Sequence, residues 1–126
     1  MPPAHSLAVD FCGLKLASPI VLLSGCVGFG EEYTRVEGFS NRDVGAIVLK
    51  GTTREPRLGN PAHRVYETPM GMLNAIGLQN PGADHVIDQI LPTLDFTETA
   101  FFANVCGSTI EDYVEVTRRF DASPID

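Results

Sequence analysis

The sequence predicts a parallel α/β fold, and three observations support that prediction. Continuous apolar runs occur at 19–24, 44–51 and 99–107, as expected for strands that are buried on both faces. A segment with helical features follows each run, which gives the alternating strand and helix order of a parallel sheet. Glycines and polar side chains come directly after each run, at the edge where parallel strands end and ligands bind.

The N-terminal part of the chain combines a predicted hairpin with the first buried strand. Apolar and polar residues alternate from Leu7 to Leu16 around Cys12-Gly13, which is the pattern of a short β-hairpin. The run at 19–24 leads into glycines at 25, 28 and 30 and then into a polar segment, 31–40, that could form a helix. The glycine spacing fits neither the dinucleotide-binding G-x-G-x-x-G pattern nor a phosphate-binding P-loop.

The second predicted strand, 44–51, ends at Lys50 and is followed by roughly thirty residues rich in Gly, Pro and Asn. Loops of this length inside compact domains are usually functional. A helix is predicted next, with Asn80 as its cap and Pro81 in its first turn. Pro92 must end or kink this helix. Its apolar face would comprise Val86, Ile87, Ile90, Leu91 and Leu94.

The third strand, 99–107, precedes a second amphipathic helix. Ser108 and Glu111 have the spacing of a capping box at its start. Glu115 and Arg119 are predicted to form an exposed pair one turn apart. The final residues, "SPID", are where we expect a further strand to begin. The inner face of the helix would comprise Ile110, Tyr113, Val114 and Thr117.

Composition and charge exclude several classes of protein. The 126 residues are 44% hydrophobic and 20% charged, which is ordinary for one globular domain. A net charge of -7 argues against nucleic acid or an anionic membrane as a partner. No apolar run reaches the roughly 18 residues of a spanning helix, and no signal peptide is recognisable, so we expect a cytoplasmic location.

Basic residues cluster on this acidic chain in one segment. Lys50, Arg54, Arg57 and Arg64 are accompanied there by a single acid, Glu55. Such a patch indicates either a site for a small anionic molecule or a solvated loop with scattered arginines, and charge alone leaves both interpretations open.

The cysteines and histidines do not form a metal or catalytic motif. Cys12, Cys26 and Cys106 are widely spaced and include no C-x-x-C pair, so we expect neither a zinc site nor an iron–sulfur cluster in this chain. We interpret the cysteines as small buried apolar residues with reduced thiols. The histidines, at positions 5, 63 and 85, are expected to be structural or exposed to solvent.

Two strand ends and one loop are the strongest candidates for a ligand site. Lys50 ends an apolar strand, so its ammonium group either reaches solvent or is held near a ligand where it could stabilise negative charge. Asn104 also has two interpretations: its amide either forms hydrogen bonds with nearby backbone groups or binds the edge of a ligand. The uncharged loop 71–82, "GMLNAIGLQNPG", combines amides with glycines, which suits either a tight turn or a flat polar ligand such as a pyrimidine.

Several segments in this order resemble dihydroorotate dehydrogenase, and most closely the catalytic subunit of its class 1 B-type. The similar segments are "SPIVLLSGCVGFGEEY", "LKGTTREPRLGNPAHRVYETPMGMLNAIGLQNPG" and "ANVCGS". The resemblance covers nearly the whole chain. It implies that residues 1–126 are the N-terminal portion of one FMN-binding (β/α)8 TIM barrel domain, truncated after about three βα units. Independently of the resemblance, three strands cannot close a barrel, so the chain is either a small open α/β domain or part of a larger one.

The resemblance also implies a function and a set of binding residues. The activity would be oxidation of dihydroorotate to orotate in pyrimidine biosynthesis, with hydride passing from C6 to FMN while a base removes a proton from C5. Lys50 would lie between the orotate and the flavin and would stabilise the reduced flavin. The cofactor-binding positions would be Ser24, Lys50, Gly51 and Asn104. The substrate-binding positions would be Lys50, Asn74, Ala75, Ile76, Gly77 and Leu78.

Some parts of the family pattern have no counterpart here. The family's catalytic base is a cysteine in a motif like Asn-x-Ser-Cys-Pro-Asn after the fourth strand, and neither Cys26 nor Cys106 occupies that position. We therefore predict no catalytic base within this chain and expect the chain alone to be inactive. The B-type resemblance further implies an electron-transfer partner subunit with FAD and a [2Fe–2S] cluster that passes electrons to NAD, in a heterotetramer containing a homodimer of the catalytic subunit.

Two other functions remain open at this point. One is a related flavin barrel that acts on another pyrimidine, such as dihydrouracil. The other belongs to a different class of protein: a non-catalytic remnant of half a barrel that binds a ligand or none.

Overall fold

The computed structural model describes residues 7–126, and its centre is a three-stranded parallel sheet in the order β3–β4–β7. Ile47 at the middle of the central strand pairs with Leu22 on one side and Phe101 on the other. The strands are β3 (Val21–Leu22), β4 (Ala46–Val48) and β7 (Ala100–Phe102). The α/β class and all three strands predicted from the apolar runs are therefore confirmed.

The strands are shorter than the apolar runs, and β3 is less buried than its composition predicts. Ala46 and Ile47 of the central strand are buried, whereas Ile20 and Leu23, which flank β3, are more than half exposed. β3 is an edge strand whose outer side pairs with no other strand within the described residues. Parallel pairing continues beyond β4 and β7 as a single bridge between Thr52 and Val105.

Helix α2 (Ile110–Asp121) is present where the sequence predicts it, but its cap and buried face differ from the prediction. The capping box is formed by Thr109 and Asp112 instead of Ser108 and Glu111. The predicted inner residues Ile110, Tyr113, Val114 and Thr117 are all exposed. Val116 and Phe120 are buried in their place. Both sets fit a helical period, and the face that carries the large Phe120 side chain is the one that packs on the core.

The helix predicted after Asn80 has an irregular form. Gly82 is the N-cap of α1 (Ala83–His85), and the Asn80 side chain instead accepts a hydrogen bond from the Gly82 N–H at 3.0 Å. The chain then forms a π-helical turn, Val86–Ile90, and a 3-10 turn, Leu91–Thr93, that contains Pro92 and ends the helix as predicted.

The helix that segment 31–40 could form is not present. One 3-10 turn, Tyr33–Arg35, occupies part of the segment, and none of its residues is buried. A single polar turn with no apolar face to pack lacks the tertiary contacts that stabilise short helices. A second 3-10 turn, Asn41–Asp43, precedes β4.

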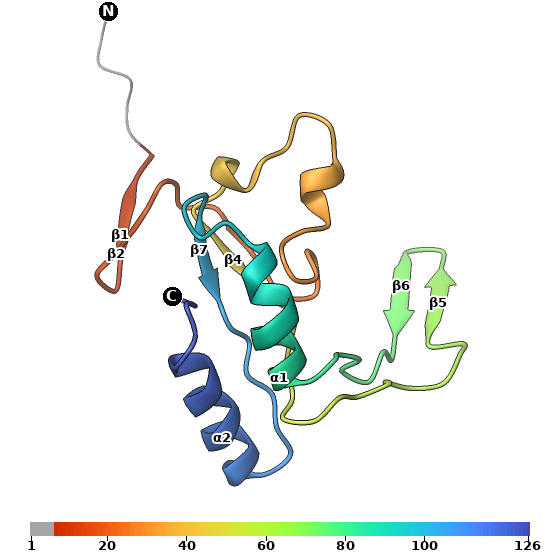
Figure 1. Ribbon diagram of the computed structural model, residues 1–126. Helices are drawn as coiled ribbons and strands as arrows, with labels where there is room; N and C mark the ends of the chain where they lie inside the picture. The colour runs from red at the N-terminus through yellow and green to blue at the C-terminus, as the bar shows by residue number, and fades with distance from the viewer. Residues whose placement is uncertain (1–6) are drawn as a thin grey trace, which may run out of the picture.

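The apolar core lies where the sheet meets α1 and α2. The sheet contributes Ile47 and Phe101 to the core, the π-helical turn after α1 contributes Val86, and α2 contributes Phe120. Figure 1 shows both helices packed beside the short strands. None of the helices in the described part of the chain is both long and apolar enough to cross a membrane.

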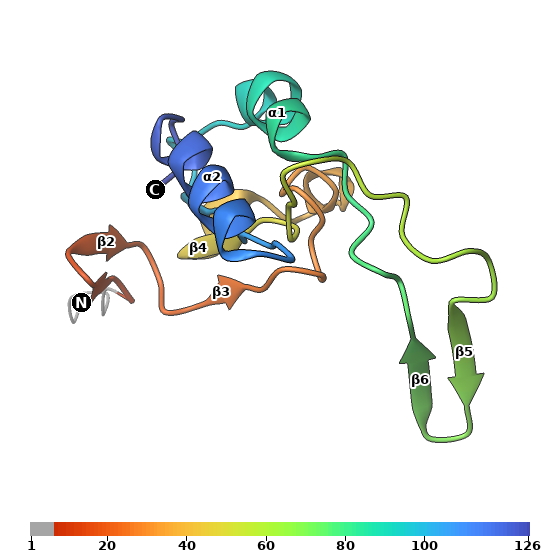
Figure 2. The same ribbon diagram turned by 90° about the horizontal axis from the view of Figure 1, so that it is seen from below.

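Two antiparallel hairpins project from opposite sides of this core (Figures 1 and 2). The first, β1 (Val9–Phe11) with β2 (Leu14–Leu16), confirms the hairpin predicted around Cys12-Gly13. The second, β5 (Val65–Thr68) with β6 (Gly71–Asn74), lies inside the segment that the sequence predicts to be a loop. Its short strands carry exposed side chains on both faces, so they lack the alternation that identifies a half-buried strand.

Candidate functional site

The carboxyl ends of the three parallel strands bring the predicted strand-end residues together. Ser24 follows β3, Lys50 and Gly51 follow β4, and Asn104 follows β7. The Asn104 Nδ2 donates a hydrogen bond to the Ser24 Oγ at 2.7 Å, and the Asn104 carbonyl oxygen accepts one from the Thr52 N–H at 2.8 Å. Side chains separated by as many as 80 residues in sequence therefore meet at one edge of the sheet.

Gly51 fits this edge because no side chain would. A Cβ atom built there would lie 2.9 Å from the Cys106 Sγ and 3.4 Å from the Asn104 Nδ2. Gly51 is buried, and the missing side chain allows the segment after β4 to pack closely against Asn104 and Cys106.

Lys50 is half-buried and lines two neighbouring cavities. One cavity, of about 610 Å³, is open to solvent and is also lined by Asn74, Ile76, Gly77 and Leu78. The other, of about 430 Å³, includes Phe29 and Arg57. The Lys50 N–H donates to the Gly28 carbonyl oxygen at 2.7 Å, which fixes the backbone from which the side chain extends.

Loop 74–78 follows the hairpin and faces Lys50 across the larger cavity. Gly77 has a φ of +78°, and a Cβ atom there would come within 2.8 Å of Asn60, so the two loops approach too closely for a side chain. Leu78 has a φ of +54°, a conformation that is unusual for a bulky residue. Ala75, which the family resemblance assigns to the substrate site, does not line the cavity, and its N–H donates to the Arg64 carbonyl oxygen at 2.8 Å.

Two asparagines that sequence reasoning did not select as site residues anchor loop 74–78. The Asn60 N–H donates to the Ile76 carbonyl oxygen at 2.9 Å, and its Nδ2 donates to the Ala75 carbonyl oxygen at 2.7 Å. The buried Asn80 donates from Nδ2 to the Leu78 carbonyl oxygen at 2.7 Å. Adjacent Gly59 and Pro81 mark both asparagines as turn residues, but no sequence signal indicates which backbone they hold.

The basic patch predicted between Lys50 and Arg64 does not form as a unit. Arg54 pairs with Glu55 at 3.8 Å, and Arg64 donates to the Gln79 side chain. Lys50 and Arg57 line one cavity, whereas Arg54 and Arg57 line another that the acidic residues Glu55 and Asp112 also line. The interpretation as scattered arginines therefore describes Arg54 and Arg64, and Lys50 is the member of the set that lines the cavity with loop 74–78.

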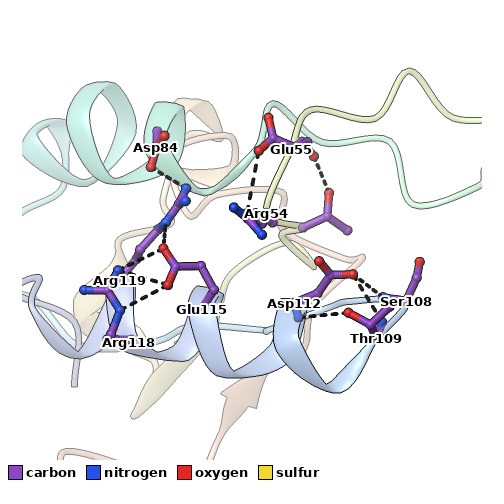
Figure 3. A network of polar contacts seen from close by, with 10 residues as sticks. Arg54, Glu55, Asp84, Ser108, Thr109, Asp112, Glu115, Arg118 and Arg119 are labelled. Atoms are coloured by element: carbon purple, nitrogen blue, oxygen red, sulfur yellow. Dashed lines mark hydrogen bonds and ion pairs between the residues drawn. The ribbon is translucent and has the colours of Figure 1, made fainter.

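A network of charges connects α2 to α1 and to the loop after β4 (Figure 3). Arg119 reaches from α2 to Asp84 on α1 at 2.7 Å, and it also forms the predicted pair with Glu115 at 2.8 Å. This pair is half-buried and not exposed as predicted, because Arg119 lies between α2 and α1. The Ser108 and Thr109 N–H groups donate to the Asp112 carboxylate and hold its pKa below the usual value, and the nearby Arg54 acts in the same direction. This network stabilises the helix that supports β7 and lies outside the cavity at Lys50 and loop 74–78.

The cysteines are more exposed than the sequence predicts. Cys12 and Cys26 are exposed and Cys106 is half-buried, because the first lies in a hairpin turn and the second in the loop after β3. His63 and His85 are exposed, as expected, and His5 lies outside the described residues. No group of three or more metal-ligating side chains occurs in residues 7–126.

Comparison with known proteins identifies the family. A family model described as dihydroorotate dehydrogenase matches residues 6–125. This chain belongs to the dihydroorotate dehydrogenase family. The resemblance inferred from the motifs around Ser24, Lys50, loop 74–78 and Asn104 is thereby confirmed at the level of the family.

Individual relatives agree with this membership. The chain is 53% identical over 120 residues to the dihydroorotate dehydrogenase B (NAD(+)) catalytic subunit of Bacillus caldolyticus, and 54% identical over 119 residues to that of Listeria welshimeri. These matches cover 95% and 94% of this chain and 38% of each relative, so the chain spans less than half the length of the curated relatives.

The fold agrees with a solved structure as well. The crystal structure of DHODH from Eimeria tenella in complex with ferulenol superposes with a TM-score of 0.65 at 20% sequence identity. The superposition covers 94% of this chain and 34% of that chain. Since the identity is low, this likeness establishes a shared fold for the part that aligns.

Proposed function

We propose that this chain provides the substrate loop and part of the flavin site of a dihydroorotate dehydrogenase, which oxidises dihydroorotate to orotate in pyrimidine biosynthesis. The observation that carries this proposal is the cavity of about 610 Å³ in which Lys50 faces Asn74, Ile76, Gly77 and Leu78. Membership in the dihydroorotate dehydrogenase family supports it. Residues 1–126 would form the first three βα units of a (β/α)8 barrel.

The hydrogen-bonding groups of loop 74–78 suit an anionic ligand. The carbonyl oxygens of Ala75, Ile76 and Leu78 are occupied by Asn60 and Asn80. The N–H groups of residues 76–78 have no hydrogen-bond partner within the described part of the chain. Donors therefore remain available, and together with the Lys50 ammonium group they favour a carboxylate or carbonyl ligand over a cation. Dihydroorotate and orotate both carry these groups.

The residues at the strand ends fit a flat cofactor such as FMN. Ser24 accepts a hydrogen bond from Asn104, so the Ser24 hydroxyl hydrogen remains free to donate to a ligand. When bound, the flavin would supply the acceptor for the electron pair that leaves dihydroorotate. Lys50, held partly away from water between two cavities, would stabilise negative charge that develops beside it.

The proposal assigns the catalytic base to no residue of this chain. Cys26 and Cys106 are the nearest thiols in sequence to the strand ends, and neither lines the cavity that joins Lys50 to loop 74–78. The chain therefore binds and orients the substrate, while removal of the proton from C5 requires a group outside the described residues.

The electron acceptor is proposed to be a partner subunit with FAD and a [2Fe–2S] cluster that reduces NAD. The names of the curated relatives, which specify a B-type NAD(+) enzyme and a catalytic subunit, support this assignment. We further propose a homodimer of catalytic subunits within a heterotetramer, and a cytoplasmic location that agrees with three free cysteines.

Turnover of the full-length catalytic subunit containing these residues tests the proposal. We expect the subunit alone to reduce an artificial dye with dihydroorotate, and to reduce NAD efficiently only after the electron-transfer subunit is added. Dye reduction with dihydrouracil and not with dihydroorotate would overturn the choice of substrate. NAD reduction by the catalytic subunit alone at the rate of the complex would overturn the choice of partner.

A further inference from the structure

We propose that Asn80 is a positioning residue that holds loop 74–78 against the segment after β4 and thereby sets the position of the loop relative to Lys50. This inference rests on the proposed function only for the identity of the ligand. The hydrogen bonds on which it stands are properties of the fold.

The Asn80 carboxamide is buried and uses both of its ends. Its Oδ1 accepts from the Thr53 N–H at 3.1 Å and from the Gly82 N–H at 3.0 Å. Its Nδ2 donates to the Leu78 carbonyl oxygen at 2.7 Å and to the Thr53 Oγ1 at 3.0 Å. With 5% of its surface exposed, this side chain exchanges few of these bonds with water. One side chain therefore connects the end of the loop, the start of α1 and the segment after β4.

Leu78 is the part of the loop that most needs an anchor. Its φ of +54° is unfavourable for a branched side chain, so the residue returns to an extended conformation unless its surroundings hold it. Asn80 holds it from only two residues away through the Leu78 carbonyl oxygen. Asn60 anchors the other half of the loop but is exposed to solvent, so its bonds are more easily replaced by water.

The same segment also fixes Lys50. The Thr52 Oγ1 donates to the Lys50 carbonyl oxygen at 2.9 Å, and the next residue is Thr53, the partner of Asn80. Lys50 and Leu78 are thus tied to adjacent residues of one short segment, and both line the cavity of about 610 Å³. If Leu78 is released, the N–H donors of loop 74–78 are no longer held in position, whereas Lys50 stays in place. We therefore expect ligand affinity to fall more than the turnover rate.

A purely structural role for Asn80 is the competing explanation, and Asn41 provides the matched control. Asn41 is also buried, and its Nδ2 also donates to a backbone carbonyl oxygen, that of Gly30 at 3.1 Å. Its side chain forms no hydrogen bond with loop 74–78 or with the segment after β4 in the described part of the chain. Asn80→Asp and Asn41→Asp each replace a buried amide donor by a carboxylate. Only in Asn80→Asp does this carboxylate face the Leu78 carbonyl oxygen.

The experiment compares these variants in the full-length holoenzyme by calorimetric titration with orotate, steady-state kinetics and amide hydrogen exchange. For Asn80→Asp we expect the dissociation constant of orotate to rise roughly tenfold, kcat to change by less than about twofold, and residues 76–78 to exchange faster. For Asn41→Asp we expect a similar loss of thermal stability with unchanged orotate binding. Asn80→Ser, which retains an acceptor for the Gly82 N–H and adds no charge, replaces Asn80→Asp if that variant does not fold.

Unchanged orotate binding and loop exchange in the Asn80 variant would overturn the inference. An equal loss of orotate binding in Asn41→Asp would do the same, because the effect would then follow stability alone. Hydrogen exchange by itself decides whether Asn80 anchors the loop. Failure of the unmodified enzyme to bind orotate would therefore count against the proposed function and not against the anchor.

Discussion

Lys50 is the residue at which the end of the central strand meets two cavities and loop 74–78. Its backbone belongs to the end of the buried sheet, and its side chain lines cavities on two sides. A charge held in such a partly enclosed place interacts more strongly with a ligand than a charge at the open surface. Its side chain contributes little to the core, since Leu49 before it supplies the buried apolar group.

Replacing Lys50 by Ala in the full-length enzyme should therefore reduce activity without unfolding the protein. We expect kcat to fall by about 10²- to 10³-fold, the scale for removal of a preorganised charge-stabilising group. Orotate and flavin binding should weaken as well. Steady-state kinetics and flavin content are the measurements, and Arg57→Ala, which removes an exposed cation from the neighbouring cavity, is the control with a much smaller effect. Near-normal turnover and flavin content in Lys50→Ala would show that the lysine only reaches solvent.

Helix α2 is the element whose ends are most completely specified. Thr109 accepts from the Asp112 N–H at 3.1 Å, and Asp112 accepts from the Ser108 and Thr109 N–H groups, so both halves of the capping box are formed. At the other end of the helix, Arg118 and Arg119 lie where the helix dipole favours positive charge. Residues 103–109, which include Asn104, connect β7 to α2, so this cap also fixes the far end of the segment that carries Asn104.

The cap predicts a dependence of stability on pH. The pKa of Asp112 is lowered from 3.8, first by the Ser108 N–H and further by the Thr109 N–H. The ionised Asp112 carboxylate therefore contributes fully to folding stability above the ordinary pKa of an aspartate. This contribution is lost as the pH falls through the lower pKa of Asp112 in the folded state. Thermal melts should show a smaller decrease in melting temperature on acidification for Asp112→Asn than for the unmodified protein. Parallel acid dependence in the two proteins would contradict this.

At the scale of the whole molecule, the described residues leave a large apolar surface exposed. Within residues 7–126, the edge strands β3 and β7 each pair with one strand only. The hairpin β5–β6 carries Tyr66 and Leu73 as a cross-strand pair, and these side chains are 71% and 65% exposed. Met70 at its tip is 97% exposed. Such edges and patches promote association unless another surface covers them.

The 126-residue chain produced on its own should therefore be poorly stable and inactive. We expect strong binding of a dye that reports apolar surface, and association that increases with protein concentration, measured by fluorescence and light scattering. Replacing Tyr66 and Leu73 by Thr should reduce dye binding while preserving the strands, because Thr also favours β-structure. A sharp cooperative melt from a monomer without dye binding would contradict this expectation.

The sequence by itself determined the α/β class, the three parallel strands and the family. Continuous apolar runs specify buried strands locally, and motifs such as "NAIGLQNPG" are specific without any knowledge of their contacts. The tertiary structure decided which face of α2 is buried, that Asn80 anchors a loop instead of capping α1, and that a hairpin forms within 65–74. In each case the local sequence is compatible with more than one structure. Contacts between residues that are distant in sequence determine which of these structures forms.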